Sequence, residues 1–528
     1  MKKFSGLLLV GCSAVALAGC GADDISSPGA GSIVINNPTP TPAPTPAPTS
    51  GTVTPATDCP AIGATTQLRN DGTISGPEGT WRVCTLPALI NANTTLPKVP
   101  GLLYRLAGRV DVGCDGGFSA PTSAAPFTTT TASCSGRSLT ADTNVTLTID
   151  PGVIIYGENG AEPAWLAVNR GNKIDAQGSS TAPIIFTSAE NVRGRNDDTA
   201  QGQWGGVVLL GRGIVTDCSY GSVANQDCQR DTEGSVNPAI FGGRDNAYNA
   251  GIMRYVQIRY SGFVLGANTE LQSLTGEGLG TGTRLDYFQS VNSSDDGAEF
   301  FGGAVNFKHY ISVNADDDSL DTDTGVQGKF QYLILAQRNG AGDALMEIDS
   351  NGAESDTPRQ KLTVVNFTGI QPTDNQNSDA ASVLIRGNSD VTWANGIINT
   401  PNNECLRLNG SGTTPATLRA FSVVMSCNSA KYLGTGSYTA ASTQTQFGSG
   451  ANGNNDAFTS TLTSTFVNGA NESGVAAYNA STIDSFFDAT TYIGAVRDAN
   501  DTWFRGWTCD NATANFGSNQ ACTALPTT

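Results

Sequence analysis

The residues most able to do chemistry are acidic side chains in the middle of the chain. Two segments, 291–299 and 313–321, carry them at an offset of 22 residues, which aligns Val291 with Val313 and Asn292 with Asn314. A fixed repeat of this length is typical of coils that stack on one another. On neighbouring coils, equivalent residues lie about 4.8 Å apart. The acidic residues concerned are Asp295, Asp296, Glu299, Asp317, Asp318, Asp321 and Asp323.

Carboxylates at this spacing repel one another unless a cation or a proton lies between them. Calcium takes about six to eight oxygen ligands in an irregular geometry, so we expect these seven residues to form a calcium site. The segment 321–325 has the pattern D-x-D-x-G but lacks the full spacing of an EF-hand loop. Two alternatives stay open. One is a row of solvated turn aspartates that bond their own backbone, and the other is chance similarity between two Asp/Gly-rich loops.

Other catalytic arrangements have little support in the sequence. His309 is the single histidine, so a two-histidine metal site is impossible and a Ser-His-Asp triad has one candidate base. It stands in the apolar segment 307–311, which favours a structural role. The sequence contains no G-x-S-x-G elbow and no P-loop. We therefore expect a binding or structural role and assign no catalytic residue.

A scaffold of short strands must position the acidic residues. Glycine is abundant, with 62 residues, and only 14% of the chain is charged, a composition typical of strands and turns. From Leu147 onward, short apolar runs end in Gly, Asn, Asp or Pro, as in 153–156 and 184–187. This pattern indicates an all-β solenoid, barrel or sandwich, and the 22-residue repeat favours the solenoid.

The formal net charge of −18 disfavours nucleic acid and anionic lipid headgroups as partners. The charge is compatible with divalent cations or neutral glycans, and equally with a role in solubility alone.

Ten of the 12 cysteines remain once Cys12 and Cys20 at the start of the chain are set aside. An even number in an exported protein indicates disulfides, and no CxxC supports a zinc or thiol redox site. Cys405 and Cys427 are 22 residues apart, which predicts a bond between equivalent positions of adjacent coils. The simplest pairing joins nearest neighbours: Cys59–Cys84, Cys114–Cys134, Cys218–Cys228, Cys405–Cys427 and Cys509–Cys522.

The first 20 residues have the order of a signal peptide, with lysines at positions 2 and 3, an apolar run over 4–18, and Leu17-Ala18-Gly19-Cys20. This segment resembles the signal of bacterial lipoproteins. The resemblance implies removal of residues 1–19 and attachment of acyl chains such as palmitate to Cys20. A plain secretory signal is the alternative. The apolar run is shorter than the about 20 residues that a membrane-spanning helix needs.

The remaining chain divides into four predicted parts. Residues 20–57 hold the lipidated Cys20 and a Pro/Thr-rich tether, in which 38–48 favours extended polyproline II. We predict an N-terminal capping region over 58–144 and a parallel β-helix over 145–430. Residues 431–528 are expected to form a loop-rich C-terminal capping region whose aromatic segments cover the open end of the helix.

The body resembles the right-handed parallel β-helix of pectate-lyase-like proteins, on the residues 148–153, 173–178 and 183–187. More narrowly, it resembles a family of uncharacterised bacterial outer-membrane lipoproteins with such a body. The motifs that carry this resemblance are 204–207, 294–296 with 299–303, 316–318 with 321–325, and 484–487 with 492–495 and 506–508.

These resemblances imply an all-β, right-handed parallel β-helix with capping regions, anchored by lipid to the outer membrane of the cell envelope on its periplasmic or surface face. The implied partners are a glycan or another envelope protein. A polysaccharide-degrading enzyme is the alternative function. Lyases on this fold use calcium-binding aspartates with a basic residue, for which Lys308, Lys329 and Arg338 are candidates. Glycosidases on this fold use carboxylate pairs, for which Asp295/Asp296 and Asp317/Asp318 are candidates.

Overall fold

The computed structural model describes residues 52–63, 66–134, 136–160, 163–233, 237–266, 269–323, 325–350, 352–372, 381–410 and 414–527. Residues from Ser50 onward form one compact unit. The predicted signal peptide, the lipidation site Cys20 and most of the tether lie outside the described residues. Within the described ranges, the helices are too short or too polar to cross a membrane.

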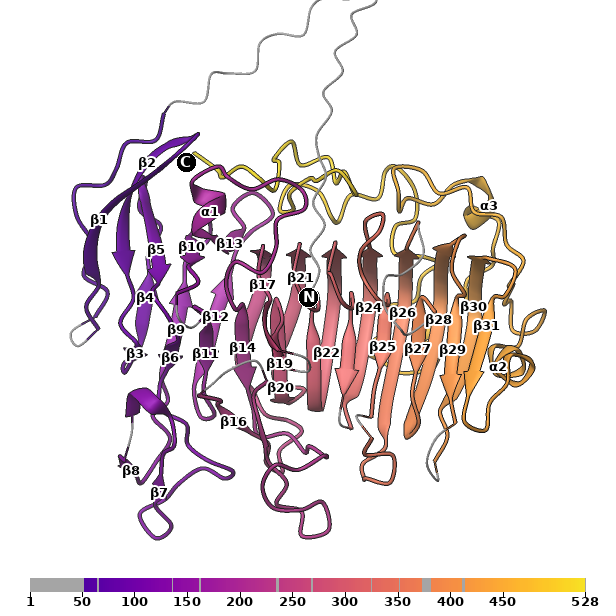
Figure 1. The fold of residues 1–528 in the computed structure, drawn as a ribbon, viewed down its shortest axis with the longest axis horizontal. Helices are drawn as coiled ribbons and strands as arrows, with labels where there is room; N and C mark the ends of the chain where they lie inside the picture. Colours follow the sequence, from indigo (N-terminus) through magenta and orange to yellow (C-terminus); the bar gives the residue numbers. More distant parts are fainter. Residues whose placement is uncertain are drawn as a thin grey trace, which may run out of the picture. The chain divides into compact units, whose positions relative to one another are not determined.

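Parallel strands stack into a β-helix, which confirms the predicted fold class (Figure 1). Each of the first coils places one short strand on each of three faces. The first face contains β4 (Thr94–Leu96), β9 (Thr146–Ile149) and β12 (Lys173–Gln177). The second face contains β2 (Gly79–Thr85), β5 (Leu102–Leu106), β10 (Ile154–Gly157) and β13 (Ile184–Ser188). The third face begins with β3 (Leu89–Ile90), β6 (Val110–Val112), β11 (Leu166–Val168), β14 (Val207–Leu210) and β20 (Leu274–Leu279).

In later coils, one long bent strand spans the first and second faces. The bend falls at residues with positive φ, namely Tyr255, Tyr287, His309, Tyr332, Asn366, Asn395 and Ser422. The parallel pairing omits the bent residue on both strands, and the register continues unchanged beyond it. The long strands are β17 (Gly251–Arg259), β21 (Arg284–Val291), β22 (Glu299–Val313), β24 (Gln327–Ala336), β26 (Gln360–Ile370), β28 (Ser389–Thr400) and β30 (Thr417–Cys427).

The third face continues beside these long strands. Its later members are the start of β22 and then β23 (Asp321–Asp323), β25 (Met346–Ile348), β27 (Val383–Ile385), β29 (Leu406–Asn409) and β31 (Tyr432–Thr435). The predicted 22-residue register holds here, because Val291 pairs with Val313 and Glu299 pairs with Asp321. The next coil is longer, since Asp321 pairs with Glu347.

The interior of the coils is a continuous apolar core. Phe300 and Phe307 come from β22 and Phe330 comes from β24, and their ring centroids lie 5.7–6.3 Å apart. All three side chains are fully buried. Parallel strands that are buried on both faces have nearly continuous apolar sequences, which explains the short apolar segments of this chain. Burial of this surface is the main source of stability for the coils.

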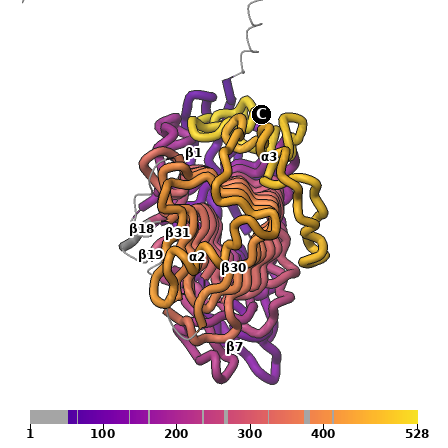
Figure 2. Tube along the Cα trace, turned by 90° about the vertical axis from the view of Figure 1, so that its right-hand side faces the viewer, coloured from indigo at the N-terminus to yellow at the C-terminus, as the bar shows by residue number. Residues whose placement is uncertain are grey.

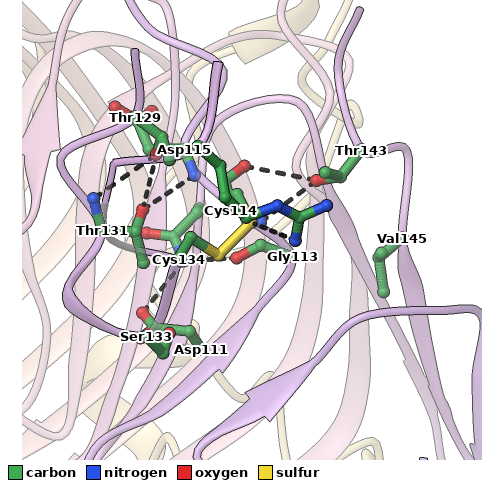
Figure 3. The surroundings of a disulfide bond; sticks show 12 residues. Asp111, Gly113, Cys114, Asp115, Thr129, Thr131, Ser133, Cys134, Thr143 and Val145 are labelled. Atoms are coloured by element: carbon green, nitrogen blue, oxygen red, sulfur yellow. Dashed lines mark hydrogen bonds between the residues drawn. A yellow bond between two sulfur atoms is a disulfide. The ribbon is translucent and has the colours of Figure 1, made fainter. Parts of the chain in front are cut away.

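The sequence predicted that the parallel coils start at residue 145, but in the structure they begin earlier. β2 and β5 already pair in parallel, and β1 (Arg69–Gly76) adds an antiparallel strand at this end. An insertion over 113–145 hides the periodicity in the sequence. It carries β7 (Phe127–Thr128), the 3₁₀ turn η1 (Ala132–Cys134) and β8 (Ser138–Leu139), and the Cys114–Cys134 disulfide anchors it (Figure 3).

The C-terminal segment covers the last strands with a helix, but its aromatic segments do not lie there as predicted. The helix α2 (Ala440–Phe447) packs against β29, β30 and β31, and its Phe447 enters the core there. Residues 456–527 then run back along the outer side of the second face towards the first coils (Figures 1 and 2). They include α3 (Ala470–Ser473) and η2 (Ala480–Thr482). We call residues 456–527 the tail, and the surface beneath it the tail-covered face.

All five predicted disulfides are present. The reason given for Cys405–Cys427 was wrong, however. Cys427 pairs in register with Thr400, so the two cysteines do not occupy equivalent positions. The positions differ because the local repeat is longer than 22 residues. The bond connects the end of β30 with the turn before β29, and so it still joins neighbouring coils.

Candidate functional site

The predicted acidic residues gather on the outer side of the third face and in the turns that lead into it. Asp295 and Asp296 lie between β21 and β22, and Asp317 and Asp318 occupy the equivalent turn of the next coil. Glu299 and Asp321 are register partners on adjacent strands. We call this surface, from β20 to β25 with its preceding turns, the acidic face.

Backbone hydrogen bonds fix the turn carboxylates in place. The Asp318 backbone N–H donates to Asp296 Oδ1 over 2.9 Å, and the Ala344 N–H donates to Asp318 Oδ1 over 2.7 Å. Gln272 Nε2 donates to Asp295 Oδ2 over 3.2 Å. Asp296 and Asp318 therefore each accept a bond from the turn of the following coil, whereas Asp295 accepts one from a side chain of the preceding coil.

Three groups of carboxylates approach closely enough to share an ion. In each group, one oxygen from every residue lies within 4.8 Å of the others. The Ca²⁺–oxygen distance is about 2.4 Å, so two oxygens on one ion can be separated by up to about 4.8 Å. The three groups are Asp295/Asp296/Asp317, Asp296/Glu299/Asp321 and Asp317/Asp318/Asp343.

Six of the seven predicted residues belong to these groups, and Asp323 does not. Asp323 Oδ2 lies 3.3 Å from Arg230 Nη1, so an ion pair engages it. Sequence reasoning missed Asp343, because the 22-residue offset does not extend to the longer coil that contains it. An alignment that places Glu347 opposite Asp321, as the strands pair in the structure, also places Asp343 opposite Asp317.

Burial makes ionisation of these carboxyls costly. Asp295, Asp296, Glu299 and Asp318 are only 3–6% exposed. Burial, and secondarily the charges of the neighbouring carboxylates, raises the pKa of all four well above the usual range, and it does the same for Asp321. The causes are desolvation and like-charge repulsion, and the attraction of a bound cation would offset both.

A disulfide-pinned insertion over residues 211–250 covers part of the acidic face. It carries β15 (Arg230–Asp231) and β16 (Ile240–Phe241), and the Cys218–Cys228 bond closes it. Arg230 lies over the Phe301 ring at 5.3 Å. Thr232 Oγ1 donates to Glu277 Oε2 over 2.8 Å, and burial raises the pKa of Glu277 to about 8.

Carboxylates outnumber the arginines that pair with them on this face. Arg230 contacts Asp217, Glu233 and Asp323, and Arg386 contacts Glu347 and Asp349. The acidic residues gathered here are Glu233, Asp295, Asp296, Glu299, Asp317, Asp318, Asp321, Asp323, Asp343, Glu347 and Asp349. In the described part of the chain, the three carboxylate groups bring like charges together, which is costly in a buried place unless protons or cations lie between them.

The basic residues proposed from the sequence as lyase bases lie elsewhere. Lys308 Nζ is 2.8 Å from Asp488 Oδ2, and Lys329 Nζ is 2.5 Å from Asp484 Oδ2, so the tail engages both. Arg338 pairs with Asp316, which is outside the three groups. The lysines stand on the long strands, whereas the acidic residues belong to the third face and its turns.

His309 belongs to a stack of rings on the long strands. Its ring centroid lies 4.1 Å from that of Tyr287 and 4.7 Å from that of Tyr332, in nearly parallel planes. The His309 Nδ1 atom lies 2.8 Å from Asp286 Oδ1, and Trp503 of the tail approaches the ring at 5.0 Å. Both faces of the imidazole are occupied by neighbouring rings.

Comparison with known proteins supports the architecture. A family model described as a pectate-lyase-like beta helix domain matches residues 130–508. No curated protein and no solved structure matched the chain. The matched range contains most of the coils, the acidic face and most of the tail. The chain therefore belongs to the family of pectate-lyase-like beta-helix domains.

Proposed function

We propose that this protein is a lipid-anchored component of the cell envelope whose β-helix binds calcium on the acidic face. Its role is binding or structural, with a glycan or an envelope protein of the outer membrane as partner. The observation that carries the calcium proposal is the set of three carboxylate groups, each with oxygens within 4.8 Å of one another.

The charge balance supports a cation over an empty cluster. Asp296 and Asp318 each accept a backbone hydrogen bond, which favours their ionised forms. Their burial opposes ionisation. A divalent cation placed among the carboxylates would offset the repulsion and let these hydrogen bonds keep their full strength.

The ligand chemistry supports calcium among the divalent cations. The three groups consist of carboxylates alone, with neither histidine nor cysteine. Oxygen-only sites suit calcium and magnesium, whereas zinc and copper favour nitrogen or sulfur ligands. The carboxylates come from irregular turns, and calcium tolerates irregular geometry better than magnesium, which requires a near-ideal octahedron.

Burial argues that the acidic face holds an ion and does not cleave a polymer. A polysaccharide must reach the carboxyl groups that cleave it, and Asp296 and Asp318 are 5% and 3% exposed. The family is compatible with both glycan binding and polysaccharide degradation. A glycan partner would therefore contact another part of the surface, and the cation would stabilise the coils and their insertion.

Calcium titration of the full chain tests the proposal. After treatment with a chelator, isothermal titration calorimetry with calcium should show saturable binding, and the melting temperature should rise with calcium concentration. The double variant Asp296→Asn/Asp318→Asn should lose most of the binding. The control Asp498→Asn, at a 41% exposed side chain of the tail, should retain it. Failure of calcium to bind or to stabilise the wild-type chain would contradict the proposal.

The lipid anchor rests on the order of residues before Cys20. The lysines at positions 2 and 3, the apolar run and the small residues at 18 and 19 match the requirements of a lipoprotein signal. Several acyl chains would hold the protein at a membrane far better than one. Metabolic labelling with a palmitate analogue should mark the wild-type chain, and Cys20→Ser should abolish the label. Labelling that persists in Cys20→Ser would contradict the assignment.

A further inference from the structure

A polar groove lies on the second face near the first coils. Its volume is about 500 Å³, within the range of small-ligand sites. Strand β1 borders it on one side, and the segment after α1 (Ala189–Val192) borders it on the other. The hairpin tip packs closely against α1, since a Cβ on Gly76 would fall 1.8 Å from the Val192 carbonyl oxygen. The lining residues include Thr73, Ser75, Arg105, Tyr156, Arg193 and Arg195.

An alternating chain of ion pairs holds the arginines of this groove. Arg105 contacts Asp71 at 3.2 Å and Glu158 at 2.7 Å. Arg193 contacts Glu158 at 2.9 Å and Glu190 at 2.7 Å. The chain ends at two more exposed arginines, Arg69 on Asp71 and Arg195 on Glu190. Four guanidinium groups therefore alternate with three carboxylates, so the network carries a net positive charge.

The rest of the body does not share this charge. Between residues 52 and 212 the sequence has 11 Lys and Arg against 13 Asp and Glu, which is close to neutral. From residue 213 onward it has 16 against 32. The net charge of −18 is thus concentrated in the later coils and the tail. The repulsion of anions expected from the whole chain does not extend to the first coils, where the groove lies.

The groove suits an anion because its donors are already positioned. A guanidinium has five N–H donors, and one carboxylate contact leaves several of them available. Ion pairs restrict the rotamers of Arg105 and Arg193, so an entering anion would lose little side-chain entropy in ordering them. The side chains of Arg193 and Arg195 are 32% and 67% exposed, which makes them accessible. The hydroxyl groups of Thr73 and Ser75 add uncharged donors.

We propose that this arginine groove binds a phosphate group, carried by a lipid headgroup or by a soluble phosphorylated ligand. Guanidinium groups pair with phosphate through parallel hydrogen bonds. The groove lies at the end of the body where the described chain begins. There the Val53 N–H donates to the Glu78 carbonyl oxygen over 2.8 Å, beside the β1–β2 hairpin. The lipid source rests on the proposed anchor, which would hold the body at a membrane.

Two measurements on residues 20–528 with Cys20→Ser test the groove without interference from an acyl anchor or from the apolar run over 4–18. The first is calorimetric titration with inorganic phosphate. The second is cosedimentation with phosphatidylcholine vesicles, with and without about one-fifth phosphatidylglycerol. A chelator is present throughout, so calcium cannot bridge acidic residues to the vesicles. Binding should weaken at high salt because the contact is ionic.

The variant Arg193→Ala/Arg195→Ala should reduce binding by about tenfold or more, as expected for loss of charge-assisted hydrogen bonds. The control Arg419→Ala/Arg497→Ala removes the same charge at exposed sites outside the groove and should leave binding unchanged. Equal unfolding midpoints of the two variants would exclude a folding defect.

The outcomes separate the possible sources of the phosphate. Binding to the anionic vesicles supports a lipid headgroup, and binding to phosphate alone supports a soluble ligand. No binding to either probe, or equal losses in the two double variants, would overturn the proposal. Because a chelator is present and Cys20 is replaced, a negative result here leaves the calcium and lipid-anchor experiments unaffected.

Discussion

The tail-covered face and the acidic face belong to the same coils, yet their polar side chains meet different kinds of partner. On the tail-covered face, neutral amides meet the tail backbone, as where Gln257 Nε2 donates to the Trp507 carbonyl and Gln289 Nε2 donates to the Cys509 carbonyl. On the acidic face, carboxylates meet other carboxylates. Residues of this chain supply the contacts on the tail-covered face, whereas on the acidic face buried carboxyls lie close to one another.

The difference shows how one repeated scaffold can carry two faces whose stability depends on different interactions. Apolar contacts and hydrogen bonds from neutral amides contribute to the tail-covered face beside the ion pairs Lys308–Asp488 and Lys329–Asp484, so calcium should change its stability little. Buried like charges make the acidic face dependent on the solution around it. Variants on the two faces should therefore respond differently to calcium and pH.

The largest expected effect is on the tail-covered face. Trp507 is fully buried, lies about 6 Å from the rings of Tyr255 and Tyr287, and donates from Nε1 to the Trp503 carbonyl. Trp507→Ala should lower the free energy of unfolding by about 3–5 kcal/mol, measured by urea denaturation. The loss should be the same with calcium and with chelator. A loss below about 1 kcal/mol would indicate that the tail is only loosely attached.

On the acidic face, we expect a substitution whose effect on the free energy of unfolding changes sign between chelator and calcium. Asp296→Asn/Asp318→Asn keeps an amide oxygen at each turn but removes two buried charges. With chelator, the variant should be more stable than the wild type by about 2–3 kcal/mol, because repulsion is relieved. With calcium, it should be less stable, because ligands are lost. Urea denaturation in both buffers measures the free energy of unfolding of the variant and the wild type. If the variant changes it in the same direction in both buffers, the acidic face does not depend on calcium as expected.

A smaller pH effect is expected from Glu277 beneath the insertion. Burial raises the pKa of Glu277 from 4.5 to about 8, so the folded state holds a proton that the unfolded state releases between these values. The free energy of unfolding should therefore fall as pH rises from about 4.5 to about 8. Glu277→Gln should reduce this slope and be more stable than the wild type by about 2 kcal/mol at pH 8.5.

Glu277→Gln preserves an oxygen that can accept the hydrogen bond from Thr232, so the comparison isolates the charge. Thermal unfolding at several pH values provides the measurement. Parallel pH profiles for the wild type and the variant would show that Glu277 does not change its protonation on unfolding.

The smallest effect is expected in the ring stack. His309→Asn should cost about 1 kcal/mol, since two stacking contacts are lost. Asparagine suits the bend because Asn366 and Asn395 occupy the equivalent position with positive φ. Chemical denaturation should give the same loss with and without calcium. A calcium-dependent loss would mean that the two faces are coupled through the coil.

The sequence contained enough information for the repeated parts of the structure. The 22-residue offset placed Asp295 beside Asp317 and Asp296 beside Asp318, because stacked coils convert a sequence period into a column. The cysteine pairs followed from proximity in sequence, although the longer repeat at Cys405 and Cys427 changed their relation to the coils.

The parts of the structure that the sequence did not predict are those without a sequence repeat. The tail is irregular, and it contacts strands that lie up to several hundred residues away, as in the bonds from Arg259 Nη1 to the carbonyls of Cys522 and Ala524. The cover over Glu277 likewise comes from an insertion with its own disulfide. Such contacts depend on tertiary packing, which local patterns do not encode.

The path of the tail has a mechanical consequence. Leu525 packs with Val53 and Trp81, and its N–H donates to Glu78 Oε1, so the last part of the described chain is fastened to the first strands. A pulling force applied near Val53 would meet resistance from both ends of the stack at once. Peeling the coils away one by one would require the tail to detach first, which makes this long repetitive body resemble a closed loop under load.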